Sequence, residues 1–107
     1  MKKSFIIENG IEYSIEEYDN GNNNGNKYWI LNNKLHRING PAIEYSDGTK
    51  FWFLHGKYHR INGAAIEWTD GDKWWYLDDI KYTKRAYYLE LLKRGLISKK
   101  EAFIELI

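Results

Sequence analysis

Hydrophobic and polar residues recur along this chain with a period of 23 residues. Residues 34–48, KLHRINGPAIEYSDG, and residues 57–71, KYHRINGAAIEWTDG, repeat one phrase and keep HRING unchanged. The same period relates a set of tryptophans and leucines: Trp29, Trp52, Trp75, Leu31, Leu54 and Leu77. A shortened copy without HRING spans residues 5–21. Repetition at a fixed spacing predicts an array built from one supersecondary unit.

Each unit reads as a β-hairpin. Asp47-Gly48 and Asp70-Gly71 predict two-residue turns between alternating strands, and Asn32-Asn33 and His55-Gly56 predict tight turns at the opposite end. A two-residue turn at Asp47-Gly48 sets the register. It places Glu44 opposite Phe51, Ile43 opposite Trp52 and Ala42 opposite Phe53, and the Asp70-Gly71 turn likewise places Ile66 opposite Trp75.

The pattern becomes helical near the C-terminus. TKRAYYLELLKRG predicts a helix with its N-cap at Thr83 and its end at Gly95, and Ser98 to Glu101 matches a capping box for a second helix. The predicted fold is therefore mainly β, an antiparallel meander of about 23-residue hairpin repeats capped by two C-terminal α-helices.

This reading divides a single domain, 1–107, into successive units. The units are a degenerate repeat at 5–21, repeats at 27–49 and 50–72, a partial repeat at 73–83 and a helical cap at 84–107. The stretch NGNNNGN, residues 20–26, is expected as a flexible insertion between units.

One face of the predicted sheet carries more large rings than a solvent-facing surface needs. Opposite the Trp and Leu positions lie Tyr28, Phe51, Phe53, Trp74 and Tyr76. Helices, a second copy of the chain or a ligand could cover this face. Two short helices cannot cover six to eight strands that each occupy about 4.8 Å. We therefore expect part of this face to stay uncovered and to bind a partner.

The repeated HRING corner has a structural and a functional interpretation. As structure, its Asn-Gly pairs turn the chain, and its arginines pair with Glu44 and Glu67 or with exposed carbonyl groups. As function, two His-Arg pairs line one rim and bind a phosphate or carboxylate while nearby rings stack on a base. The candidate ligand-binding residues are His36, Arg37, His59, Arg60, Trp52 and Trp75. The two interpretations are compatible.

Composition narrows the function classes. The net charge of +1 argues against long nucleic acid as a partner. The absence of cysteine and of a signal-peptide core favours a cytoplasmic protein without disulfides, and no run approaches a membrane span. We expect no metal or other cofactor, because the histidines lack metal-site spacing. We also expect no enzymatic activity, and a small hydrolase is the least favoured alternative.

The segment WILNNKLHRINGPAIEYSDG, followed by WFLHGKYHRINGAAIEWTDG, resembles a repeat common in bacteriophage and large-virus proteins. The pattern of that repeat is W-x-x-N-G-K-x-H-R-x-x-G-P-A-x-E-x-x-D-G, and it is loosely similar to MORN repeats. The resemblance implies a phage or viral binding protein with a β-repeat fold, located in the host cytoplasm. It makes a counter-defence role the leading expectation, in which the protein sequesters a nucleotide-like signal or occupies a host protein. Self-assembly into a homo-oligomer is the alternative.

Overall fold

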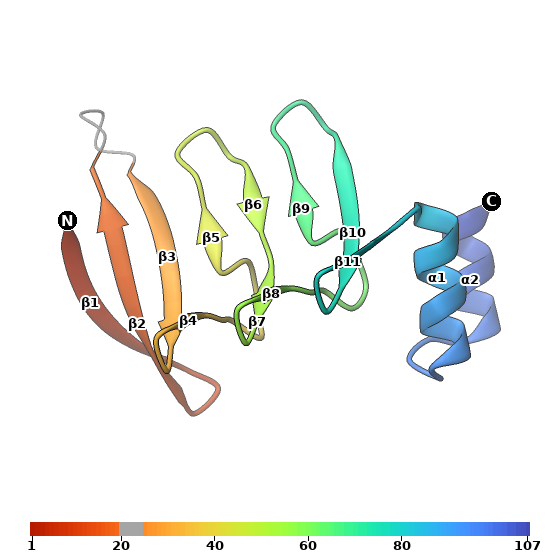
Figure 1. Ribbon diagram of the computed structural model, residues 1–107, viewed down its shortest axis with the longest axis horizontal. Helices are drawn as coiled ribbons and strands as arrows, with labels where there is room; N and C mark the ends of the chain where they lie inside the picture. Colours follow the sequence, from red (N-terminus) through yellow and green to blue (C-terminus); the bar gives the residue numbers. More distant parts are fainter. Residues whose placement is uncertain (20–24) are drawn as a thin grey trace.

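Short antiparallel strands follow one another along the long axis of the molecule (Figure 1). The computed structural model describes residues 1–19 and 25–107 and measures 44 × 32 × 20 Å. Most of the expected insertion at 20–26 lies outside the described residues. The strands are β1 (Lys2–Glu8), β2 (Ile11–Tyr18), β3 (Asn26–Leu31), β4 (Lys34–Leu35), β5 (Ile43–Glu44), β6 (Lys50–Phe51), β7 (Phe53–Leu54), β8 (Lys57–Tyr58), β9 (Ile66–Glu67), β10 (Lys73–Leu77) and β11 (Ile80–Tyr82).

The strands pair in meander order, which confirms the predicted fold class. Within the described residues the main sheet runs β1-β2-β3-β5-β6-β9-β10-β11, with β4 attached to β3, and β7 and β8 form a separate two-stranded sheet. Four two-residue turns close the hairpins along one edge of the array: Asn9-Gly10, Asn32-Asn33, His55-Gly56 and Asp78-Asp79. All eight turn residues have positive φ, as such turns require, so the predicted tight turns are confirmed.

The predicted register at the Asp-Gly turns is wrong by one residue. Ile43 lies opposite Phe51 and Ile66 lies opposite Trp74. The loop has three residues rather than two, because the Gly48 N–H donates to the Tyr45 carbonyl while the Tyr45 N–H donates to the Thr49 carbonyl. Only Gly48 of the pair has positive φ, which is the signature of a type I turn followed by a glycine bulge.

The corrected register explains why the aromatic face is closed at its centre. Phe51 pairs with Ile43 on one side and Ile66 on the other, and it is only 7% exposed. Phe53 is 8% exposed, and its ring lies 4.3 Å from that of Tyr58 on β8. The expectation that these two rings are available to a partner is therefore wrong.

Most of the other aromatic rings on this face also pack against one another. The ring of Tyr58 lies 5.1 Å from that of Tyr76, and Trp68 meets Trp74 edge to face at 5.6 Å. Tyr28, Trp74 and Tyr76 are half-buried around the same core. Rings from successive hairpins thus cover one another, which a single-sheet reading of the sequence did not anticipate.

The two helices cover the end of the array rather than a face of the sheet (Figure 1). Helix α1 (Lys84–Lys93) packs on β10 and β11, and helix α2 (Lys99–Leu106) packs on α1. The predicted caps are confirmed: Thr83 accepts from the Ala86 N–H, and Ser98 forms a full capping box with Glu101. Gly95 ends α1 with a φ of 72°. No helix in the described part of the chain is long and apolar enough to cross a membrane.

Candidate functional site

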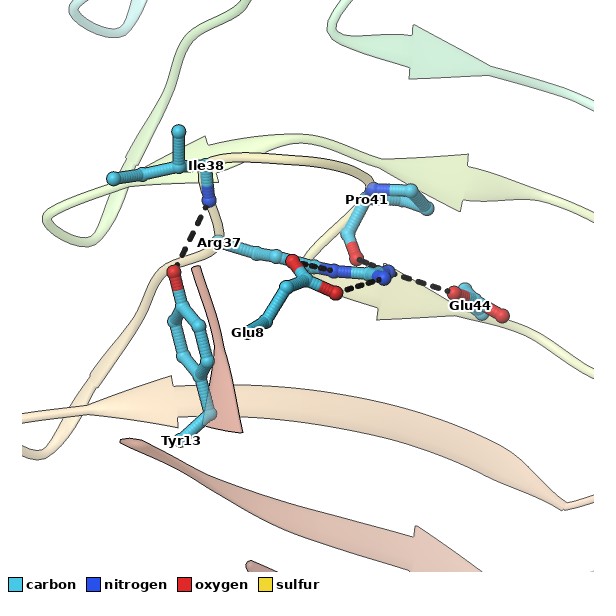
Figure 2. Close-up of polar contacts among 6 residues, drawn as sticks. All are labelled: Glu8, Tyr13, Arg37, Ile38, Pro41 and Glu44. Atoms are coloured by element: carbon cyan, nitrogen blue, oxygen red, sulfur yellow. Dashed lines mark hydrogen bonds and ion pairs between the residues drawn. The ribbon is translucent and has the colours of Figure 1, made fainter. Parts of the chain in front are cut away.

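Both HRING segments form the same corner, which the arginine side chain closes. We call residues 36–40 corner 1 and residues 59–63 corner 2. In corner 1 the Arg37 Nη1 donates to the Pro41 carbonyl and to Glu44, each at 3.2 Å (Figure 2). In corner 2 the Arg60 Nη1 donates to the Ala64 carbonyl and to Glu67, each at 3.0 Å. The predicted pairing of these arginines with carboxylates and carbonyls is confirmed.

Each guanidinium group is held between a tryptophan ring and a glycine. The Cζ atom of Arg37 lies 3.6 Å from the centre of the Trp29 ring, and that of Arg60 lies 3.8 Å from the centre of the Trp52 ring. A Cβ added to Gly40 would lie 2.7 Å from Arg37 Nη1, and neither Gly40 nor Gly63 has positive φ. Glycine is therefore needed at the corner for space rather than for backbone conformation.

The histidine of each corner joins its own unit to the next. His36 is 2% exposed, and its Nδ1 accepts the His55 N–H at 2.8 Å. The Nδ1 of His59 accepts the Asp78 N–H at 3.1 Å. Both donors are the first residue of a positive-φ turn. Burial lowers the pKa of both imidazoles, since it disfavours the charged form, although Asp78 opposes this effect at His59. Neutral imidazole is the form that accepts these bonds.

Two tyrosines outside the HRING phrases anchor the corners, and sequence reasoning missed both. The Tyr13 hydroxyl accepts the Ile38 N–H at 3.3 Å, and the Tyr87 hydroxyl accepts the Gly63 N–H and donates to the Arg60 carbonyl. Tyr13 comes from β2, in the degenerate repeat, and Tyr87 comes from α1, so the HRING phrase gives no signal for either residue.

A groove of about 510 Å³ separates the two corners. It is lined by residues 37–40 of corner 1 and 59–61 of corner 2, together with Trp52 and Leu54, and we call it the corner groove. Four of the six candidate ligand-binding residues thus meet there: Arg37, Trp52, His59 and Arg60.

The other two candidate ligand-binding residues lie elsewhere. His36 is sealed beneath corner 1, where its ring lies 4.4 Å from that of His55. Trp75 packs against the cluster formed by the helical cap. Thr83 stands 23 residues after Arg60, so Trp75 has no equivalent arginine on its ring and α1 begins there instead.

The ion pairs around the groove leave it with no excess of positive charge. Arg37 pairs with Glu8 and Glu44, and Arg60 pairs with Glu67, so two guanidinium groups face three carboxylates. Hydrogen bonds from Arg37 lower the pKa of Glu8 below its ordinary value and keep it ionised. The groove can therefore attract one negative group at an arginine edge, but it lacks the field that a polyphosphate calls for.

In the described residues, no three histidine, cysteine or acidic side chains lie close enough together to hold a metal ion.

No protein-family model matches the chain, and neither the curated proteins nor the solved structures contain a match to it. The groove and the repeat pattern are accordingly the grounds for a functional conclusion.

Proposed function

We propose that this chain is a non-catalytic binding protein whose binding site is the corner groove. The observation that carries the proposal is a groove of about 510 Å³ in which two arginines, a tryptophan and aliphatic side chains converge. This volume lies within the range of about 300–1,000 Å³ that is usual for ligand sites. A flat or anionic group fits the chemistry of Arg60 and Trp52.

The resemblance to phage and large-virus repeats extends the proposal to a biological role. A viral binding protein in the cytoplasm of an infected host serves as a counter-defence factor when its ligand is a nucleotide-like signal or a host protein. The two ligands use the groove differently. A nucleotide stacks on Trp52 and places its phosphate on an arginine, whereas a host protein offers a side chain to the same arginine.

A small hydrolase is less well supported by the geometry. Glu44 and Glu67 are equivalent residues, and each is tied to the arginine of its own corner. Acid and base catalysis needs two carboxyl groups in contrasting roles, whereas each of these carboxylates accepts a hydrogen bond from the Nη1 of its own arginine.

Titration of the ¹⁵N-labelled protein with anionic probes tests the proposal. The probes are inorganic phosphate, AMP, a cyclic dinucleotide and a short glutamate-containing peptide. We expect at least one probe to give saturable shifts at the backbone amides of Arg37, Ile38 and Ile61, and to lose them in Arg60→Met. The matched control Arg85→Met removes an exposed arginine on α1 and leaves the shifts unchanged. If no probe shifts the groove amides, or if the shifts survive in Arg60→Met, the proposal is wrong.

Self-assembly is a second candidate, which the edge strand β1 favours. Phe5 and Ile7 are 66% and 70% exposed there, and within the described residues β1 pairs only with β2. Antiparallel pairing of two copies centred on Phe5 would set Lys2 of one copy opposite Glu8 of the other. Light scattering at increasing protein concentration should then show a dimer that Phe5→Lys dissociates. A monomer at every concentration excludes this candidate.

A further inference from the structure

The two corners differ in how the outer edge of the arginine is satisfied. In corner 1 the Arg37 Nε donates to Glu8 Oε1 at 3.2 Å and the Nη2 donates to Glu8 Oε2 at 2.9 Å (Figure 2). Glu8 is the last residue of β1, before the first tight turn. A carboxylate from the chain itself therefore occupies this edge in a bidentate pair.

Corner 2 presents the same edge without a carboxylate. Both side-chain hydrogen bonds of Arg60 come from Nη1, and within residues 1–19 and 25–107 its Nε and Nη2 donate no hydrogen bond. In the repeat alignment Leu31 and Leu54 stand where the degenerate repeat has Glu8. The Arg60 side chain is 27% exposed, against 15% for Arg37, and it lines the corner groove.

We propose that the free Nε–Nη2 edge of Arg60 binds the carboxylate of an acidic side chain from a partner protein, in the geometry that Glu8 adopts on Arg37. This inference rests on the proposed function and names the ligand class of the same site. The chain itself supplies the template, because Arg37 and Arg60 share their tryptophan, their glycine and their inner carboxylate.

Charge and shape favour a carboxylate over a phosphate. A phosphomonoester brings nearly two negative charges to a site where three carboxylates already surround two guanidinium groups. A side-chain carboxylate brings one charge and matches the planar fork. Apolar side chains flank the fork, with Ile38 57% and Ile61 37% exposed and Leu54 beside them. An acidic residue with apolar neighbours on an extended segment therefore fits the groove.

The test follows the Nε–Hε signals of arginine in ¹⁵N-edited spectra during titration. The probe is acetyl-Leu-Glu-Leu-amide, its control is the glutamine counterpart, and inorganic phosphate and AMP form the other arms. We expect the glutamate peptide to shift the Arg60 signal saturably and to bind about tenfold or more tightly than the glutamine peptide, since bonds between charged groups are the stronger ones. Arg60→Lys keeps the charge but removes the fork, so it should weaken peptide binding about tenfold.

A second variant turns corner 1 into a copy of corner 2. Glu8→Leu removes the internal carboxylate, so the Arg37 Nε–Hε signal should begin to respond to the glutamate peptide as the Arg60 signal does. An unchanged Arg60 response in the same sample shows that this variant is folded. If the variant does not fold, the titrations of the wild-type protein alone test the inference.

Each other outcome has one meaning. Binding of phosphate or AMP without the glutamate peptide overturns this inference and leaves the proposed function intact. Equal binding of the glutamate and glutamine peptides, or shifts that spare Arg60, also overturns it. Failure of every probe refutes the inference and the proposed function together.

Discussion

Replacing the corner glycines by alanine tests how firmly each guanidinium is held. The substitutions Gly40→Ala and Gly63→Ala place a methyl group 2.7–2.9 Å from the nearest arginine atoms, which is too close for either guanidinium to keep its position. Both corners meet the same perturbation, and they differ mainly in the pair that Glu8 forms with Arg37.

The structure gives the size of the expected difference. Displacing Arg37 breaks its charged pair with Glu8, which is worth about 1.5–3 kcal/mol. It also loosens the stack on Trp29, worth about 0.5–1 kcal/mol. Alanine also restricts the conformations of the unfolded chain, which stabilises the folded state by about 0.4–1 kcal/mol. Gly40→Ala should therefore lower the free energy of unfolding by about 1–3.5 kcal/mol. Gly63→Ala should change it by no more than about 0.5 kcal/mol, because no described residue pairs with the outer edge of Arg60.

Urea denaturation followed by tryptophan fluorescence measures both variants, and urea avoids screening the ion pairs. The double variant Glu8→Leu/Gly40→Ala is the control, since without Glu8 the further cost of alanine at residue 40 should fall to that of Gly63→Ala. If Gly63→Ala costs as much as Gly40→Ala, the Glu8 pair does not distinguish the two corners and the reasoning fails.

Two further predictions concern the buried histidine and the closed aromatic face. Because burial holds the pKa of His36 below its ordinary value of 6.5, the unfolded chain takes up the proton first, and stability should fall as the pH drops below 6.5. Urea denaturation at pH 8 and pH 5.5 measures this, with a smaller loss expected in His36→Gln; equal stability at both pH values contradicts it. Phe53→Ala should cost about 3–5 kcal/mol because the ring is buried, whereas Phe5→Ala, at a ring 66% exposed, should cost little in the same assay. If Phe53→Ala does not lower the stability, the Phe53 ring is not part of the core, and the aromatic face is again a candidate docking surface.

The fold could be predicted largely from local signals. The tight turns, the helix caps and the 23-residue period each depend on residues close together in the sequence, and the structure contains all of them. The register at Asp47-Gly48 could not be predicted in this way, because an Asp-Gly pair serves both a two-residue turn and a bulged three-residue loop. That single step also misplaced Ile43 and Ile66 relative to the rings that they cover.

The candidate site was predicted in part for a related reason. Arg37 and Arg60 could be found because the repeat displays them, and the stacking of Arg60 on Trp52 lies within one unit. Sequence reasoning missed Glu8, Tyr13 and Tyr87. These residues lie outside the repeated phrase and are separated along the sequence by 24 to 29 residues from their partners in the corners. The role of His36 was also hidden, since its partner is a backbone N–H of the following unit.

The histidine joints have a consequence for how such a chain can grow. Each corner is joined to the turn of the following unit by the same hydrogen bond: the His55 N–H donates to His36, and the Asp78 N–H donates to His59. In-frame duplication of residues 50–72 would therefore supply a new histidine together with a new turn to receive it, and the joints on either side would stay as they are. Two corners enclose one groove, so every inserted copy would add one more. The number of grooves would then increase by gene duplication alone, because the new unit would use the same hydrogen bond between units.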